Sequence, residues 1–105
     1  MSFQTLFNVP TPLGFRIRTT VSYWQIIISV KHPVMEGHER IVQEVLRFPD
    51  EIRQSRRDQD VYLFYRAELP GRWTCVVVKR QEDDGFLITT YPTDRIKEGT
   101  AVWTK

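Results

Sequence analysis

The sequence predicts an α+β fold in which a helix packs across an antiparallel meander of strands. Three runs rich in β-branched and aromatic residues predict the meander, and they are Val61–Arg66, Arg72–Arg80 and Phe86–Tyr91. Turn signals separate them. Pro70-Gly71 fills the first gap, and Asp84-Gly85 in the second predicts a hairpin turn because glycine reaches positive φ without a Cβ clash. The apolar stripe of Glu36–Phe48 predicts the helix.

Length and composition place the chain among single-domain globular proteins. With 105 residues it is expected to form one domain, residues 1–105, around a modest core. Hydrophobic residues make up 41% and charged residues 27%, which argues against wholesale disorder. No apolar run approaches the roughly 20 residues of a membrane helix, and Met1–Asn8 lacks the features of a signal peptide. We therefore expect a cytoplasmic protein without a membrane partner.

The first third of the chain is the least regular part. Residues 1–11 show no clear periodicity and are predicted to form an irregular arm ahead of a folded body, residues 13–103. Leu13–Arg18 alternates apolar and polar residues, which indicates a half-buried strand. Thr19–Lys31 fits two patterns, since apolar residues recur at period two and also form a helical stripe. The residues alone leave helix and strand open for this segment.

The remaining elements follow from breakers and periodicity. His32-Pro33 interrupts the preceding segment, because a residue before proline disfavours the α region. The predicted helix then runs from about Glu36 to Phe48 and ends at Pro49. Ile52–Ser55 starts the meander, and Arg56–Asp60 is a charged turn. Ala101–Trp103 is predicted either as a short edge strand or as a segment that docks its indole on the core.

Several short segments of the chain, taken together, resemble a known family. They are His32-Pro33, Pro49–Arg53, Ser55, Val61–Tyr65, Val76–Lys79 and Thr89–Pro92. The family comprises small phage-associated and bacterial proteins placed in the barnase/EndoU/colicin/RelE-like (BECR) ribonuclease superfamily. This resemblance covers roughly Thr20 to Trp103 and implies two helices packed on one face of a roughly four-stranded antiparallel sheet, with residues 13–103 as the nuclease domain. It also favours helix for Thr20–Lys31.

The resemblance implies a metal-independent endoribonuclease that cleaves RNA by 2′-OH attack, as a toxin or a phage-derived effector. Such cleavage needs a base, an acid and groups that stabilise charge on the phosphate. His32 is the candidate acid or base, because histidine exchanges protons near neutrality. Arg56 and Lys79 are candidate phosphate ligands, Tyr65 a hydrogen-bond donor or stacking partner, and Thr90 a further phosphate contact. We expect His32, Arg56 and Lys79 to converge on one concave surface, with Tyr65 or Thr90 nearby.

Four of the five candidates also have a structural explanation. His32 can cap a helix, Arg56 can pair with an aspartate of its own turn, and Tyr65 and Thr90 suit ordinary packing within strands. No carboxylate in the strand cores resembles the glutamate base of barnase-type enzymes. The alternative function is therefore a non-catalytic module that binds RNA or a protein on the same fold.

No cofactor or metal is expected. The two histidines and the single cysteine do not have the spacing of a zinc site, and no glycine-rich phosphate loop is present. Cys75 stands in an apolar run, which indicates a buried, inert thiol. Eleven of the fifteen basic residues are arginine, the better fork for phosphate, although genome composition explains this equally well. The expected partners are RNA and a protein inhibitor or antitoxin.

Overall fold

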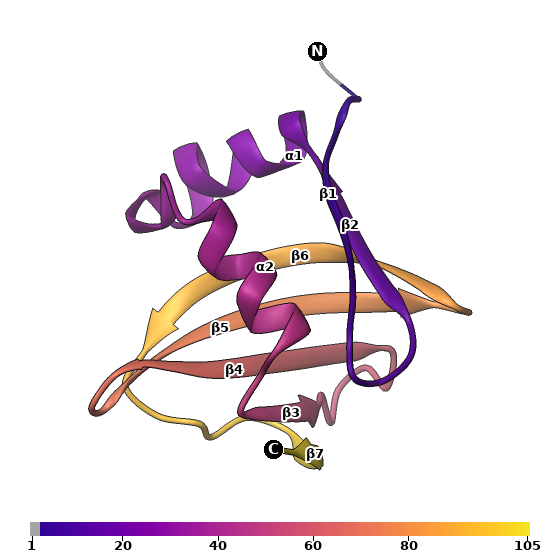
Figure 1. Ribbon diagram of the computed structural model, residues 1–105, viewed down its shortest axis with the longest axis vertical. Helices are drawn as coiled ribbons and strands as arrows, with labels where there is room; N and C mark the ends of the chain where they lie inside the picture. The colour runs from indigo at the N-terminus through magenta and orange to yellow at the C-terminus, as the bar shows by residue number, and fades with distance from the viewer. Residues whose placement is uncertain (1–2) are drawn as a thin grey trace.

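The computed structural model describes residues 3–105, which form one seven-stranded sheet and two short α-helices (Figure 1). The strands are β1 (Thr5–Pro10), β2 (Arg16–Thr20), β3 (Glu51–Gln54), β4 (Val61–Leu69), β5 (Arg72–Gln81), β6 (Asp84–Thr93) and β7 (Thr100–Thr104). The helices are α1 (Val21–Ile26), which continues into a π-helical turn at Ile27–Lys31, and α2 (Glu39–Arg47), which follows a 3₁₀ turn at Pro33–Met35. The strand order across the sheet is β1-β2-β6-β5-β4-β3-β7.

Four of the seven strands form the predicted meander. Strands β3, β4, β5 and β6 pair antiparallel in chain order, so one row across the sheet runs Glu51, Tyr65, Cys75, Tyr91. The prediction of a roughly four-stranded, wholly antiparallel sheet is wrong. Three further strands extend this meander, and β2 pairs parallel to β6, which makes the sheet mixed.

The predicted irregular arm is the main source of that error. Residues 1–2 lie outside the described part, but Thr5–Pro10 is a strand that pairs antiparallel with β2. Phe7 and Val9 alternate with exposed residues and are buried in the core. The period-two pattern covers only a few residues and ends at a proline, so the sequence alone did not predict a strand here. The strand predicted at Leu13–Arg18 begins only at Arg16, after the chain has turned at residues 12–14.

The glycine of the predicted Asp84-Gly85 hairpin turn lies inside strand β6 instead. The turn itself falls at Glu82 and Asp83, and Glu82 has a φ of 58°. Gly85 is buried and pairs with Ile17 of β2 on one side and with Arg80 of β5 on the other. A Cβ at this position would stand 2.7 Å from Cδ1 of Ile17 and 2.9 Å from the carbonyl oxygen of Lys79. Glycine is therefore required here for close packing.

The ambiguous segment Thr20–Lys31 is helical, as the resemblance implies. The Thr20 hydroxyl accepts a hydrogen bond from the Tyr23 amide at 3.1 Å and so caps the first turn. The next helix begins at Glu39, three residues later than predicted. Pro33–Met35 forms its own 3₁₀ turn first, and Gly37 then adopts a φ of 83°, which breaks the helical path.

The sheet has two differently covered faces. On the helix face, Val42, Val45 and Leu46 of α2 join the core that also contains Phe64 and Val76. Figure 1 shows α2 crossing the meander strands, with α1 above β6 and next to β1 and β2. Alternation along the strands turns other side chains to the opposite face, here called the distal face. They form a second, smaller cluster of Leu63, Tyr65 and Cys75, on which Trp73, Val77, Tyr91 and Ile96 pack. Among residues 3–105, no helix is long and apolar enough to cross a membrane.

Candidate functional site

A cavity of about 280 Å³ lies beside the aromatic cluster of the distal face. It is bounded by the junction of the π-helical and 3₁₀ turns at His32, by the middle of β4 and the end of β6, and by the connector of residues 94–99 that leads to β7. Its lining residues are His32, Tyr65, Tyr91, Thr93, Arg95, Lys97 and Glu98. The cavity brings together a histidine and three charged side chains from two segments that are far apart in the sequence, His32 and residues 95–98.

His32 reaches the cavity because the chain changes direction at this residue. The π-helical turn ends with a hydrogen bond from the His32 amide to the Ile27 carbonyl at 2.7 Å, and Pro33 starts the 3₁₀ turn. The backbone of His32 is accordingly non-helical, with φ −143° and ψ 78°. Its ring packs on Tyr91, with centroids 5.4 Å apart and planes at 39°. Within residues 3–105 the ring makes no hydrogen bond, so its nitrogens are available to a ligand.

Tyr65 and Tyr91 form one wall of the cavity, and Cys75 lies between them in the sheet and supports this wall. Tyr65, Cys75 and Tyr91 are neighbours in one row of the sheet. Burial raises the pKa of both phenols far above the usual value, and their contact with the Cys75 thiol adds to this increase. Burial also raises the pKa of Cys75 to about 12. All three groups therefore stay protonated near neutrality, and the phenols can donate hydrogen bonds but cannot act as bases.

The connector supplies the charged residues of the cavity. Arg53 of β3 holds it in place, because its guanidinium donates to the carbonyl oxygens of Glu98 at 3.5 Å and Gly99 at 3.3 Å. Gly99 has a φ of 79° and passes so close to β3 that a Cβ would overlap the backbone of Gln54. The Glu98 carboxylate is exposed but close enough to help raise the pKa values of Tyr65, Cys75 and Tyr91. Arg95 and Lys97 place two exposed cations at the same cavity.

The structure brings only part of the predicted site together. His32 and Tyr65 line the same cavity, whereas Arg56 and Lys79 are not among its lining residues. Lys79 is on the distal face too, but four residues along β5 from Cys75, which is roughly 13 Å of strand. Strands β3 and β5 run in the same direction, so Arg56 and Lys79 follow them to one end of the sheet. His32 lies at the other end, beside the end of β6.

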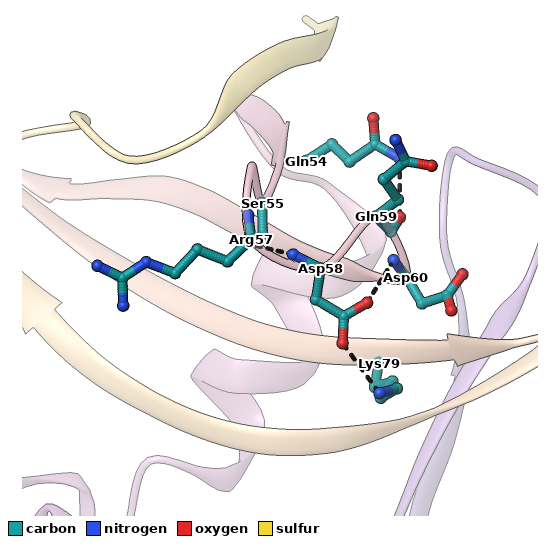
Figure 2. Close-up of polar contacts among 7 residues, drawn as sticks. All are labelled: Gln54, Ser55, Arg57, Asp58, Gln59, Asp60 and Lys79. Atoms are coloured by element: carbon teal, nitrogen blue, oxygen red, sulfur yellow. Dashed lines mark hydrogen bonds and ion pairs between the residues drawn. The ribbon is translucent and has the colours of Figure 1, made fainter.

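At its own end of the sheet, away from His32, Lys79 pairs with an aspartate of the charged turn (Figure 2). Its Nζ lies 2.9 Å from Oδ2 of Asp58, and this hydrogen bond is the main reason that the pKa of Asp58 is lowered and that of Lys79 raised. Asp58 also accepts from the Asp60 amide, which fixes the turn. Arg57 extends away from this pair in Figure 2. The Arg56 guanidinium donates to the Thr100 hydroxyl at 3.4 Å.

Thr90 is placed where no RNA can contact it. It is completely buried and pairs with Val76 on the helix face, opposite to the face that carries Tyr65. Its hydroxyl donates to the Cys75 carbonyl at 2.8 Å. The prediction that Thr90 contacts phosphate is therefore wrong, and Thr90 is not part of the candidate site.

Sequence reasoning missed the charged half of the cavity. Arg95, Lys97 and Glu98 stand in a polar connector without periodicity, so no pattern marks them as functional. The one sequence signal is Ile96, an apolar residue between charged ones. In the structure it packs on the cluster of Leu63, Tyr65 and Cys75 and so anchors the connector. Glu98 is a carboxylate of the kind that strand cores lack, supplied by a loop.

No family model matches this chain, and no match was found among curated proteins or solved structures. Within the described residues, no three histidine, cysteine, aspartate or glutamate side chains gather in a way that could hold a metal ion.

Proposed function

We propose that the protein is a metal-independent endoribonuclease that acts at the cavity beside His32. One observation carries the proposal: a histidine ring that makes no hydrogen bond to residues 3–105, a carboxylate and two cations line the same cavity of about 280 Å³. These are the groups that RNA cleavage by its own 2′-OH requires. The resemblance of the His32-Pro33 and Thr89–Pro92 segments to BECR ribonucleases supports the same reaction.

In this proposal Glu98 and His32 share the proton transfers. Glu98 is exposed and makes no ion pair within residues 3–105, so its carboxylate can accept the proton of the 2′-OH. The 2′-oxygen then attacks phosphorus, and the bond from phosphorus to the 5′-oxygen breaks. Protonated His32 donates to that leaving oxygen. The products are a 2′,3′-cyclic phosphate and a 5′-hydroxyl.

The other lining residues hold the phosphate and its charge. Arg95 and Lys97 approach from the connector as cations, and charge-assisted hydrogen bonds to phosphate are among the stronger ones that proteins make. The phenol of Tyr91 is half-buried at the cavity and stays protonated, so it remains a donor to the developing charge, while the buried Tyr65 supports this wall through Cys75. Arg95, Lys97 and Glu98 are exposed, which leaves access for a flexible, single-stranded substrate.

The test is incubation of purified protein with structured and unstructured RNA in excess EDTA, followed by analysis of the new ends. Fragments ending in 2′,3′-cyclic phosphate support the proposal, and Glu98→Gln should slow their appearance. RNA that is retained but stays intact would instead identify the non-catalytic binding module. Neither cleavage nor retention on several RNAs would point to a protein partner and would overturn the proposal.

A further inference from the structure

A second hollow of the surface, away from the cavity, combines aromatic rings with unpaired cations. This groove, of about 290 Å³, lies on the helix face between the end of α2 and the edge strand β7. Phe48 and Trp103 are its aromatic residues, Arg47, Arg66 and Lys105 its cations, and two prolines complete the lining. We call it the Phe48 groove.

Phe48 is unusually open for a phenylalanine. It ends helix α2 and is 60% exposed, although large apolar side chains are normally covered. The Arg47 guanidinium carbon lies 5.7 Å from the centre of its ring. Trp103, across the groove, is half-buried against the main core and leaves part of its indole accessible. The groove therefore presents two flat rings to solvent.

The charges around these rings are mostly uncompensated. Arg47 and Arg66 make no ion pair with any described residue, whereas Lys105 lies 3.4 Å from Asp50. Arg66 is also held rigidly, because its Nη1 donates to the Phe48 carbonyl at 2.6 Å. The groove thus combines two stacking surfaces with two arginines, Arg47 beside the Phe48 ring and Arg66 fixed to the Phe48 carbonyl, that no anion among residues 3–105 neutralises.

We propose that the Phe48 groove binds a single-stranded RNA segment that flanks the cleaved bond. Bases can stack on Phe48 and Trp103 because every base has a π face, and arginines can contact the phosphates between them. A second copy of this chain is a poor occupant, since two such grooves would bring like charges together. The choice of RNA rests on the proposed function, but binding in the groove can be measured without cleavage.

The groove and the cavity lie at the same end of the sheet. Arg66 follows Tyr65 in β4, so the two side chains point to opposite faces at adjacent positions. Asp50, next to the groove, donates its amide to the Tyr65 carbonyl at 2.8 Å. A single strand that is held at Phe48 would pass around this end of the sheet to reach the cavity.

The binding test uses a fluorescent, 2′-O-methylated oligouridylate, which cannot be cleaved by 2′-OH attack. A length of about 12 nucleotides falls within the site sizes of single-strand binders. Phe48→Ala should weaken binding about tenfold, because it removes one base-stacking surface. The logarithm of the association constant falls as the logarithm of the salt concentration rises. Arg47→Gln should make this fall less steep by about 0.7, because one phosphate contact is lost. Phe86→Ala and Arg40→Gln, two surface changes outside the groove, are the matched controls and should leave affinity and slope unchanged.

Unchanged affinity in Phe48→Ala together with an unchanged slope in Arg47→Gln would overturn the groove proposal. Displacement by poly-L-glutamate as effective as displacement by unlabelled oligouridylate would also overturn it, in favour of an acidic protein partner. Melting curves of all four variants show whether each is folded. Loss of binding in Phe48→Ala by a protein that cleaves no RNA would sustain the groove and reject only the nuclease.

Discussion

Replacing Gly85 with alanine tests the parallel pairing of β2 with β6, which the sequence did not predict. The added Cβ would stand 2.7 Å from Cδ1 of Ile17 and 2.9 Å from the Lys79 carbonyl oxygen. Ile17 is fully buried and the oxygen belongs to the backbone, so neither can move freely. Overpacking of this kind costs about 2 kcal/mol, and for a domain of this size the melting temperature should fall by roughly 8–16 °C.

Gly71 provides the matched control, because glycine is needed there for a different reason. Its φ is 74°, and a Cβ would meet nothing within 4 Å. Gly71→Ala should therefore cost about 1 kcal/mol from the left-handed backbone alone, and Gly71→Asn should recover part of it, since asparagine tolerates that region. At Gly85, asparagine should be at least as damaging as alanine. Thermal unfolding that shows Gly85→Ala unchanged, or Gly85→Asn more stable than Gly85→Ala, would refute the packing argument.

Three further predictions follow from the core, the charged turn and the thiol. Val45→Asp puts a carboxylate into a fully buried position and should lower the free energy of unfolding by about 3 kcal/mol or more, whereas aspartate at the exposed Arg40 should cost little, as urea denaturation can show. Because Lys79 lowers the pKa of Asp58, the wild-type protein should be more stable than Asp58→Asn above pH 3.8, and this difference should close as the pH falls through the lowered pKa. Urea curves of both proteins over a pH series check it, and a difference that persists in acid would contradict the pairing. Cys75, buried and with its pKa raised to about 12, should resist thiol reagents at neutral pH until the protein is denatured, and rapid labelling of the native protein would disprove its burial.

The sequence predicted correctly those strands and turns that depend on neighbouring residues in the chain. The β-branched run of β5 and the Pro70-Gly71 turn sufficed to predict its pairing with β4. Thr20–Lys31 could not be decided locally, because its apolar residues satisfy both periods, and only the cap at Thr20 and packing against the sheet select the helix. Ile17 and Gly85 pair although they are far apart in the sequence, so no pattern within either segment could predict their contact.

The candidate site was half predictable for the same reason. His32 stands out because a proline follows it, and Tyr65 because its strand is regular, and both line the cavity. Arg56 and Lys79 were grouped with them on the assumption that strand ends meet at one rim. Strand direction decides otherwise, since β6 runs opposite to β5 and brings Tyr91 and His32 to the end away from Lys79. Glu98 lies in a connector whose position only the folded chain reveals.

The most direct test of the proposed site is the rate of RNA cleavage in EDTA by His32→Ala, compared with the wild-type protein and Lys79→Ala. The His32 ring contacts the rest of the described protein by packing on Tyr91, and His32→Ala keeps the backbone hydrogen bonds of this residue, so the melting temperature of the variant should stay near that of the wild type. Its cleavage rate should fall about 10²- to 10⁴-fold, as expected for loss of a general acid, while Lys79→Ala, at the far end of the distal face, should retain turnover. Undiminished cleavage by a folded His32→Ala protein, or loss of turnover in Lys79→Ala alone, would contradict a site at this cavity.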